Sequence, residues 1–357
     1  MKKTEEIKNK EKKETKKQKE DDFLWDIFFR FCIIITVIFT LIMGIEINKH
    51  IKKIRKFNTS YDWPKFSDLK YSLFLLPLIM AYKTIIEYFS KGFVERCLAK
   101  KYKEPKNEEF RKLGIIYRHK LARHIYKFSF YFFITIFGYY ILHDLPYFPK
   151  SMLGKGHISN MFIKDYPDFY FYEKPPLLNF YYNINLAYFV NDFIFLFIME
   201  RQSDFIKMFL HHICTISLII FSFIINYLHI GALVLFCHME SDILMHITRF
   251  LLQTDNPLIL VGTVGILFTI NFVYMRQFVL GQLIYSFYTY PKFKLNIVDF
   301  SLLLFLVILF LLHIHWSYIL IYKSIELLMT RKKIVDDINY NKLVKENNKE
   351  NINKKLD

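Results

Sequence analysis

The chain has 357 residues, of which 53% are hydrophobic and 19% aromatic, and its mean hydropathy is +0.19. The apolar residues form blocks of about 20, the length of a helix that crosses a bilayer, whereas a soluble protein would mix polar and apolar residues along amphipathic segments. The formal net charge is +16, but the basic residues lie in the tails and in a few segments between apolar blocks. That distribution is typical of membrane topology signals and argues against a nucleic-acid partner. The composition therefore predicts an all-α polytopic membrane protein.

The two ends of the chain are polar and highly charged. Residues 1–22 have low complexity, and we expect them to form a disordered charged arm. They are too polar to be the apolar core of a signal peptide, so the first apolar block should remain as an anchor. Residues 329–357 are expected to form a polar cytoplasmic tail.

Between these tails the apolar blocks predict about eight transmembrane helices. They cover residues 24–46, 70–90, 127–143, 178–199, 205–227, 230–252, 257–285 and 298–325. Lys and Arg crowd residues 91–127, whereas residues 144–177 are aromatic and poor in cations, so the former should be cytoplasmic and the latter a lumenal cap. This scheme places the basic stretch 48–65 on the lumenal side, where basic residues are disfavoured, so seven spans remain an alternative.

The four cysteines form no CxxC pair, and they lie within or beside apolar blocks: Cys32, Cys97, Cys214 and Cys237. Their spacing predicts neither a disulfide framework nor a zinc site.

The fifth and sixth predicted spans carry ionisable groups that are expensive inside a bilayer. Such groups cost at least a few kcal/mol at mid-membrane, so they normally face a partner or a water-filled cavity. His238, Asp242 and His246 are spaced i, i+4, i+8 and should share one helical face. Arg249, near the cytoplasmic end, should extend to the interface.

A short turn, YLHIG, joins these two spans, so they must be antiparallel neighbours. Helical rise places His211 and Asp242 at comparable depths, which predicts that the two side chains pair and leave one imidazole nitrogen free to act as nucleophile or base. Spacing alone leaves interhelical hydrogen bonding, a proton path or a metal site open. Because the adjacent His211 and His212 point about 100° apart on a helix, both cannot easily reach one metal with Asp242, and we predict no metal site.

Residues 203–242, SDFIKMFLHHICTISLIIFSFIINYLHIGALVLFCHMESD, resemble the longevity-assurance (Lag) motif of ceramide synthases within the TLC-domain family. The shared order is an acidic-Phe start, paired histidines, an FS turn ending in Asn, IG, and a closing H-x-x-S-D. YKFSFYFFITIFGYYIL, FYYNINLAYF and LLHIHWSYILIY are similar to the first, second and last helices of that domain. The resemblance covers about 70–325, and 24–46 resembles the extra N-terminal span of some members.

The resemblance implies a TLC domain at 127–328, in which six helices form a bundle or barrel that encloses an acyl-chain cavity. Residues 23–69 would form the extra span and a loop, and residues 70–126 a pre-domain helix followed by a basic cytoplasmic loop.

The implied activity is that of a ceramide synthase in the endoplasmic reticulum membrane. Such an enzyme joins the acyl group of an acyl-CoA to the amine of a sphingoid base, sphinganine or sphingosine, and needs no cofactor besides the acyl-CoA co-substrate. The partners would be these two substrates and membrane lipid, and the family admits homo- or hetero-oligomers. The alternative is a non-enzymatic TLC-domain protein that binds or senses lipid; a proton-coupled transporter is a third interpretation.

By resemblance, His211 takes the acyl group and Asp242 is its acidic partner. Four neighbours would support them or contact substrate: His212, His238, Ser241 and Glu240. A competing mechanism has His211 assist a direct attack of the amine as a general base.

The chain departs from the family pattern at several positions. Met239 replaces an Asp, Asn185 replaces a Glu for which Asp192 could compensate, and His246 and Arg249 replace a Glu and a Lys that follow the S-D pair. Polar residues of the last two spans are expected to be structural: Arg276, Gln282, His313 and His315.

Overall fold

The structure is a computed structural model, and every element that it describes is helical. The described residues are 2–103, 108–164, 167–198, 204–289 and 296–330. The long helices are α1 (Lys2–Arg55), α2 (Lys70–Cys97), α4 (Glu108–Leu142), α5 (Leu178–Ile198), α6 (Phe205–Ile224), α7 (Leu228–Leu252), α8 (Leu258–Val273), α9 (Leu280–Thr289) and α10 (Ile297–Thr330). A π-helical turn, η5 (Tyr274–Val279), makes α8 and α9 one continuous rod.

Short helical segments lie at the ends of these rods. They are α3 (Lys100–Lys103), η1 (Phe66–Leu69), η2 (Lys150–Met152), η3 (Ile158–Phe162) and η4 (Asp168–Tyr170).

Seven stretches of the described chain are long and apolar enough to cross a membrane. They contain α1, α2, α4, α6, α7, α8–α9 and α10. The remaining predicted span is α5, whose four asparagines lower its hydropathy, but it packs against α2 and α6 in the same bundle. The chain is thus a multi-pass helical membrane protein.

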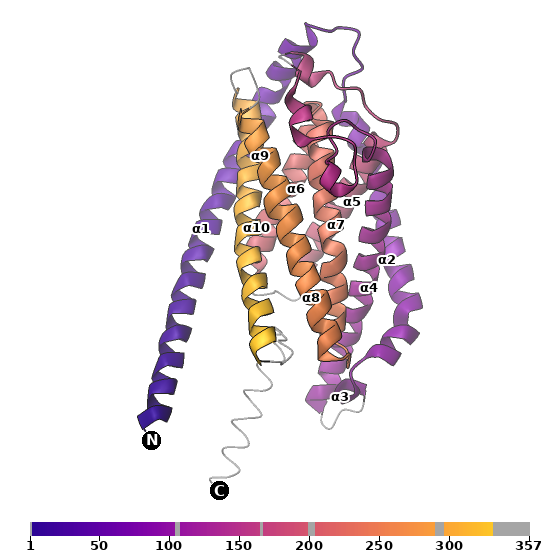
Figure 1. Cartoon of the computed structure of the whole chain (residues 1–357). Helices are drawn as coiled ribbons and strands as arrows, with labels where there is room; N and C mark the ends of the chain where they lie inside the picture. Colours follow the sequence, from indigo (N-terminus) through magenta and orange to yellow (C-terminus); the bar gives the residue numbers. More distant parts are fainter. Residues whose placement is uncertain (1, 104–107, 165–166, 199–203, 290–295, 331–357) are drawn as a thin grey trace.

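The long rods run up and down between two ends of the bundle (Figure 1). We call the end that carries α3 the basic end, and the end that carries residues 144–164 and 167–177 the aromatic end. α1 begins and α10 ends toward the basic end, which is the arrangement that eight crossings require. The basic residues that close α1 therefore lie at the aromatic end, as the eight-span scheme requires despite their charge.

Two predicted boundaries differ from the structure. The arm 1–22 was expected to be disordered, but α1 is helical from Lys2, because its Lys- and Glu-rich sequence has high helix propensity and continues into an apolar span. The segment 91–127 was expected to be a loop, but it consists largely of the end of α2, α3 and the first turns of α4. The predicted tail from 331 onward lies outside the described residues.

The turn between α6 and α7 is short and held from several sides. Asn226 adopts a left-handed conformation with φ of 63°, which asparagine tolerates better than most residues. Its Nδ2 donates hydrogen bonds to Tyr61 Oη (2.8 Å) and to the carbonyl oxygen of Tyr170 (2.5 Å). Trp63 Nε1 donates to the carbonyl oxygen of Ile224 at 2.7 Å. These contacts fix α6 and α7 as antiparallel neighbours, as their short connection predicts.

Candidate active site

The polar centre of the bundle is organised by Arg276, which lies in the π-helical turn η5. Such turns change the direction in which side chains leave a helix and are frequent at functional sites. The guanidinium is almost fully buried and contacts α7 through three groups. Its Nε donates to Ser241 Oγ (2.8 Å), and its Nη2 donates to Asp242 Oδ1 (2.5 Å) and to the carbonyl oxygen of His238 (3.0 Å). Asp242 therefore balances the charge of Arg276 inside the bundle.

The predicted pairing of His211 with Asp242 differs from this arrangement. Asp242 is the ion-pair partner of Arg276, and within the described part of the chain no hydrogen bond joins it to His211. A guanidinium is a stronger partner for a buried carboxylate than a neutral imidazole. Arg276 was expected to be structural, and the predicted pairing therefore gave the carboxylate of Asp242 the wrong neighbour.

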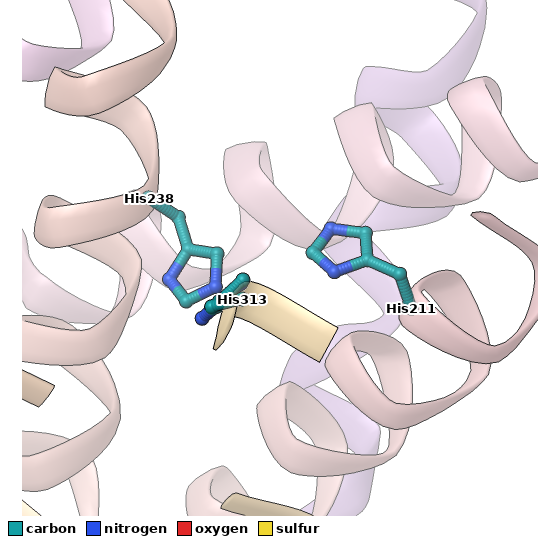
Figure 2. A group of neighbouring side chains, drawn as sticks. All are labelled: His211, His238 and His313. Carbon is teal, nitrogen blue, oxygen red and sulfur yellow. The ribbon is translucent and has the colours of Figure 1, made fainter. Parts of the chain in front are cut away.

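His211 lies instead in a group of three buried imidazoles, contributed by His211 of α6, His238 of α7 and His313 of α10. We call these residues the histidine cluster. Figure 2 shows the three side chains approaching one another from three helices. One ring nitrogen of each lies within 4.8 Å of those of the other two. The ring centroids of His238 and His313 are 4.9 Å apart, and that of His211 is 5.9 Å from His238.

Three imidazoles at this spacing could hold a metal ion such as zinc. This set differs from the combination of His211, His212 and Asp242 that the sequence suggests. Arg276 opposes such use, because its Nη1 lies 3.1 Å from Nε2 of His313 and brings a positive charge to the cluster. His211 and His238 each retain a buried ring nitrogen that contacts no partner among the described residues.

The other predicted site residues are divided between the cluster and its surroundings. Ser241 belongs to the polar centre, because its Oγ accepts from Arg276 and donates to the carbonyl oxygen of His238 at 3.1 Å. Glu240 faces α8, where its carboxylate accepts a hydrogen bond from Asn271 Nδ2 at 3.0 Å.

His212 points away from the cluster toward α5. Its ring contacts Phe193 and Phe189, with centroid distances of 6.1 and 6.4 Å. The two adjacent histidines thus diverge, as the rotation of about 100° per helical residue predicts.

The predicted stripe of His238, Asp242 and His246 does not form one site. His246 lies beside α4, where its Nδ1 is 3.1 Å from Nδ1 of His124, and its ring stacks on Tyr131 at 5.3 Å. Residues that share one face of α7 therefore contact different partners at different depths in the bundle.

The positions that depart from the family pattern lie outside the histidine cluster, and one of them, Asn185, has a buried Oδ1 with no hydrogen-bond partner among the described residues. Met239 is fully buried in the hydrophobic core, and Asn185 donates from Nδ2 to the carbonyl oxygen of Tyr181 at 2.7 Å. Asp192 forms an ion pair with Lys127 of α4, with 2.6 Å between Oδ2 and Nζ. That pairing leaves Asp192 as a partner of Lys127 rather than a substitute at position 185.

A cavity extends from His238 toward the aromatic end, between α6, α7, α9 and α10. About 490 Å³ of this space is free of protein atoms, and part of it is open to solvent. Its walls are mainly aliphatic and aromatic, with a few hydroxyl groups: Thr215, Leu218, Ile219, Ser222, Tyr227, Ile230, Gly231, Val234, Leu235, His238, Phe287, Leu302, Leu306 and Leu309. The apolar walls would suit part of an apolar chain, and His238 connects this cavity to the histidine cluster.

Sequence reasoning missed three residues of this site: Arg276, His313 and Trp316, whose ring lies 5.5 Å from that of His211. The signal available for Arg276 was a lone cation deep in an apolar span, which by itself indicates a functional site. His313 offered a similar signal, but nothing in its spacing identified His238 and His211 as neighbours.

Comparisons with known proteins agree with this region of the chain. The family model described as the TLC domain (TRAM, LAG1 and CLN8) matches residues 120–322. Ceramide synthase 5 of Homo sapiens is 28% identical over 231 residues, which are 61% of this chain and 53% of that protein.

Two further relatives have similar names. Ceramide synthase 4 of Bos taurus is 31% identical over 175 residues, 46% of this chain and 43% of that protein. Sphingosine N-acyltransferase lag1 of Schizosaccharomyces pombe is 28% identical over 159 residues, 44% of this chain and 38% of that protein. The chain thus spans about half the length of the curated relatives that it matches or less.

Proposed function

Because the chain belongs to the TLC-domain family, we propose that it is an acyl-CoA-dependent N-acyltransferase of the ceramide synthase type. The observation that carries the proposal is the buried histidine cluster, one member of which, His238, also lines an apolar cavity. An acyl chain would fill the cavity, and its thioester would lie beside His211. The names of the relatives support acyl-CoA and a sphingoid base as the two substrates.

The proposed reaction has two steps and uses no cofactor besides acyl-CoA. A ring nitrogen of His211 attacks the thioester carbonyl carbon, an N–C bond forms, the C–S bond breaks, and CoA leaves as a thiolate that is protonated. The amine of the sphingoid base then attacks the acyl-imidazole, the C–N bond to His211 breaks, and the amine loses a proton. The apolar walls of the cavity would keep water from the acyl-imidazole. We place the reaction in the endoplasmic reticulum membrane.

The roles of the neighbouring residues follow from the contacts of the cluster. The Nδ1–H of His238 donates to the carbonyl oxygen of Val234 at 2.7 Å, because a carbonyl oxygen only accepts. The free lone pair of His238 is therefore on Nε2, which suits it to take the proton of the amine. Asp242 would act through Arg276, as the counter-charge that holds the guanidinium in position.

The test uses purified full-length protein in lipid nanodiscs. With acyl-CoA alone, intact-mass spectrometry should detect an acyl adduct on the wild type that His211→Ala lacks, and addition of sphinganine should release dihydroceramide. His212→Ala is the matched control, since that side chain faces α5, and it should retain the adduct. A folded protein that binds acyl chains but forms neither adduct nor product across a panel of chain lengths would favour the lipid-binding alternative.

A further inference from the structure

His313 carries a hydrogen-bond donor whose position is fixed by Arg276. The side chain is fully buried on α10, and its Nε2 lies 3.1 Å from Nη1 of Arg276. A guanidinium has donors only, so Nε2 of His313 must be the acceptor. A neutral imidazole has one proton, and in His313 that proton must therefore be on Nδ1.

This Nδ1–H is buried and has no hydrogen-bond partner within the described part of the chain. A buried donor without a partner destabilises the fold. Other histidines of the described chain have such atoms too, His315 among them, but this donor lies in the histidine cluster. Nε2 of His238 is the complementary case, a buried acceptor that is also unpartnered. One donor and one acceptor are thus left over in the same cluster, beside the cavity.

The spacing of the cluster suits a carbonyl group between the rings. One ring nitrogen of each histidine lies within 4.8 Å of the others, and the ring centroids of His211 and His313 are 6.1 Å apart. A carbon about 3–3.5 Å from the attacking nitrogen of His211 could carry an oxygen that reaches a donor on His313.

We infer that His313 is a catalytic residue, whose Nδ1–H donates a hydrogen bond to the thioester oxygen, and that Arg276 is the positioning residue that fixes this tautomer. The inference rests on the proposed function. As the bond from His211 to the carbonyl carbon forms, the π electron pair of the C=O bond moves to the oxygen. The hydrogen bond from His313 stabilises the resulting oxyanion without transfer of the proton. When the pair returns, the C–S bond breaks and the thiolate leaves.

A bound metal ion is the alternative use of the same three imidazoles. It would require Arg276 to release His313, because a nitrogen that accepts from the guanidinium cannot also ligate a cation. The two assignments make opposite demands on His313: a protonated Nδ1 for the hydrogen bond, and a free lone pair for the metal.

The experiment measures the stretching frequency of the thioester carbonyl in bound acyl-CoA, labelled with ¹³C at that carbon. His211→Ala serves as the background, since it should hold the thioester unreacted, and difference infrared spectra are recorded in nanodiscs. A hydrogen bond from His313 should shift the band to lower wavenumber than in solution. Adding His313→Leu should remove this shift, whereas His313→Asn, whose amide nitrogen can replace Nδ1, should retain part of it.

Matched variants separate this role from a structural one. His315→Leu removes a buried histidine whose ring contacts Trp25 and Phe29 of α1, and it should leave the band unchanged. Arg276→Gln should move the band toward the solution value because the tautomer is no longer fixed, and Arg276→Lys, which has only donors, should restore the shift. With His211 intact, His313→Leu should slow formation of the acyl adduct by about 10²–10³-fold, while the KM for acyl-CoA changes little.

Three results would overturn the inference, and they differ in what else they affect. If His313→Leu leaves the band and the rate of adduct formation unchanged, the inference fails while the proposed function stands. If the purified protein holds a stoichiometric metal ion whose removal abolishes transfer, His313 is a ligand rather than a donor. If the wild type neither binds nor cleaves acyl-CoA, the proposed function fails together with the inference.

Discussion

Two buried polar clusters lie on opposite sides of the cavity, and they differ in how completely their polar atoms are paired. Toward the aromatic end, Asp299 of α10 is fully buried, and its carboxylate accepts hydrogen bonds from three side chains. Tyr227 Oη donates at 2.5 Å, Asn296 Nδ2 at 2.7 Å, and Tyr170 Oη lies 3.1 Å from both carboxylate oxygens. We call these four residues the aspartate cluster.

The histidine cluster, by contrast, retains unpartnered nitrogens on each of its three rings, within the part of the chain that the structure describes. Buried polar groups that are fully paired stabilise a fold and specify its packing, whereas unpaired ones destabilise it. The comparison indicates that the aspartate cluster holds α10 to the turn between α6 and α7 and to the aromatic cap. Under the proposed function, a substrate completes the hydrogen bonds of the histidine cluster.

The largest expected effect is a loss of activity that leaves stability unchanged. His211→Leu removes the proposed nucleophile but replaces a poorly paired buried group by an apolar one of similar size. Ceramide formation should fall by at least about 10³-fold. The midpoint of thermal unfolding in detergent should stay constant or rise, since no paired hydrogen bond is lost. A fall in both quantities would show that His211 has a structural role and would remove the contrast between the clusters.

The second expected effect is a loss of stability. Asp299→Leu leaves the hydroxyls of Tyr170 and Tyr227 buried without their acceptor, at a cost of about 1–3 kcal/mol for each. The free energy of unfolding should fall accordingly, as measured by chemical denaturation in mixed micelles. Asp299→Asn, which keeps a carbonyl acceptor, is the control and should lose less. An Asp299→Leu protein as stable as the wild type would mean that the aspartate cluster does not hold this end together.

The sequence predicted the helical part of this comparison well. Blocks of about 20 apolar residues identify membrane helices whatever their neighbours, because every backbone polar group in lipid must be paired within the helix. The short turn around Asn226 predicts that α6 and α7 are adjacent. The one span that the hydropathy criterion omits, α5, was predicted from its pattern and lies in the bundle.

The contacts of the site were harder to predict. Helical phase correctly indicated that His211 and His212 diverge. The partner of Asp242 is Arg276, whose direction depends on a π-helical turn, and such a turn has no clear sequence signal. His313 reaches the cluster from the last helix, and its neighbours follow only from how α10 packs. The aspartate cluster was missed altogether, because Asp299 stands near the start of a span, where a single acidic residue is unremarkable.

A smaller effect concerns the wall of the cavity between the two clusters. Leu306→Phe adds volume to a side chain that lines the cavity, so a long acyl chain should fit less deeply. The ratio of kcat/KM for a long to a short acyl-CoA should fall by about tenfold or more, the discrimination that one misplaced methylene can produce. Leu311→Phe, a half-buried position that does not line the cavity, is the matched control. An equal change in both variants would exclude the cavity as the site of the acyl chain.

The smallest expected effect tests whether Glu240 supplies the carboxylate that Met239 lacks. Glu240 is half-buried and accepts a hydrogen bond from Asn271 on α8, outside the histidine cluster. Glu240→Gln keeps an acceptor for Asn271, so stability should change by about 1 kcal/mol or less.

The rate of ceramide formation should stay within about tenfold of the wild type, equivalent to about 1.4 kcal/mol in the barrier. Asp242→Asn is the comparison, because it leaves the guanidinium of Arg276 buried without its counter-charge and should cost more in both rate and stability. If Glu240→Gln were the more damaging change, a carboxylate that faces α8 would matter more than the ion pair that anchors Arg276. The reactive groups would then extend beyond the three imidazoles. The contrast between the paired aspartate cluster and the unpaired histidine cluster would no longer identify the catalytic residues.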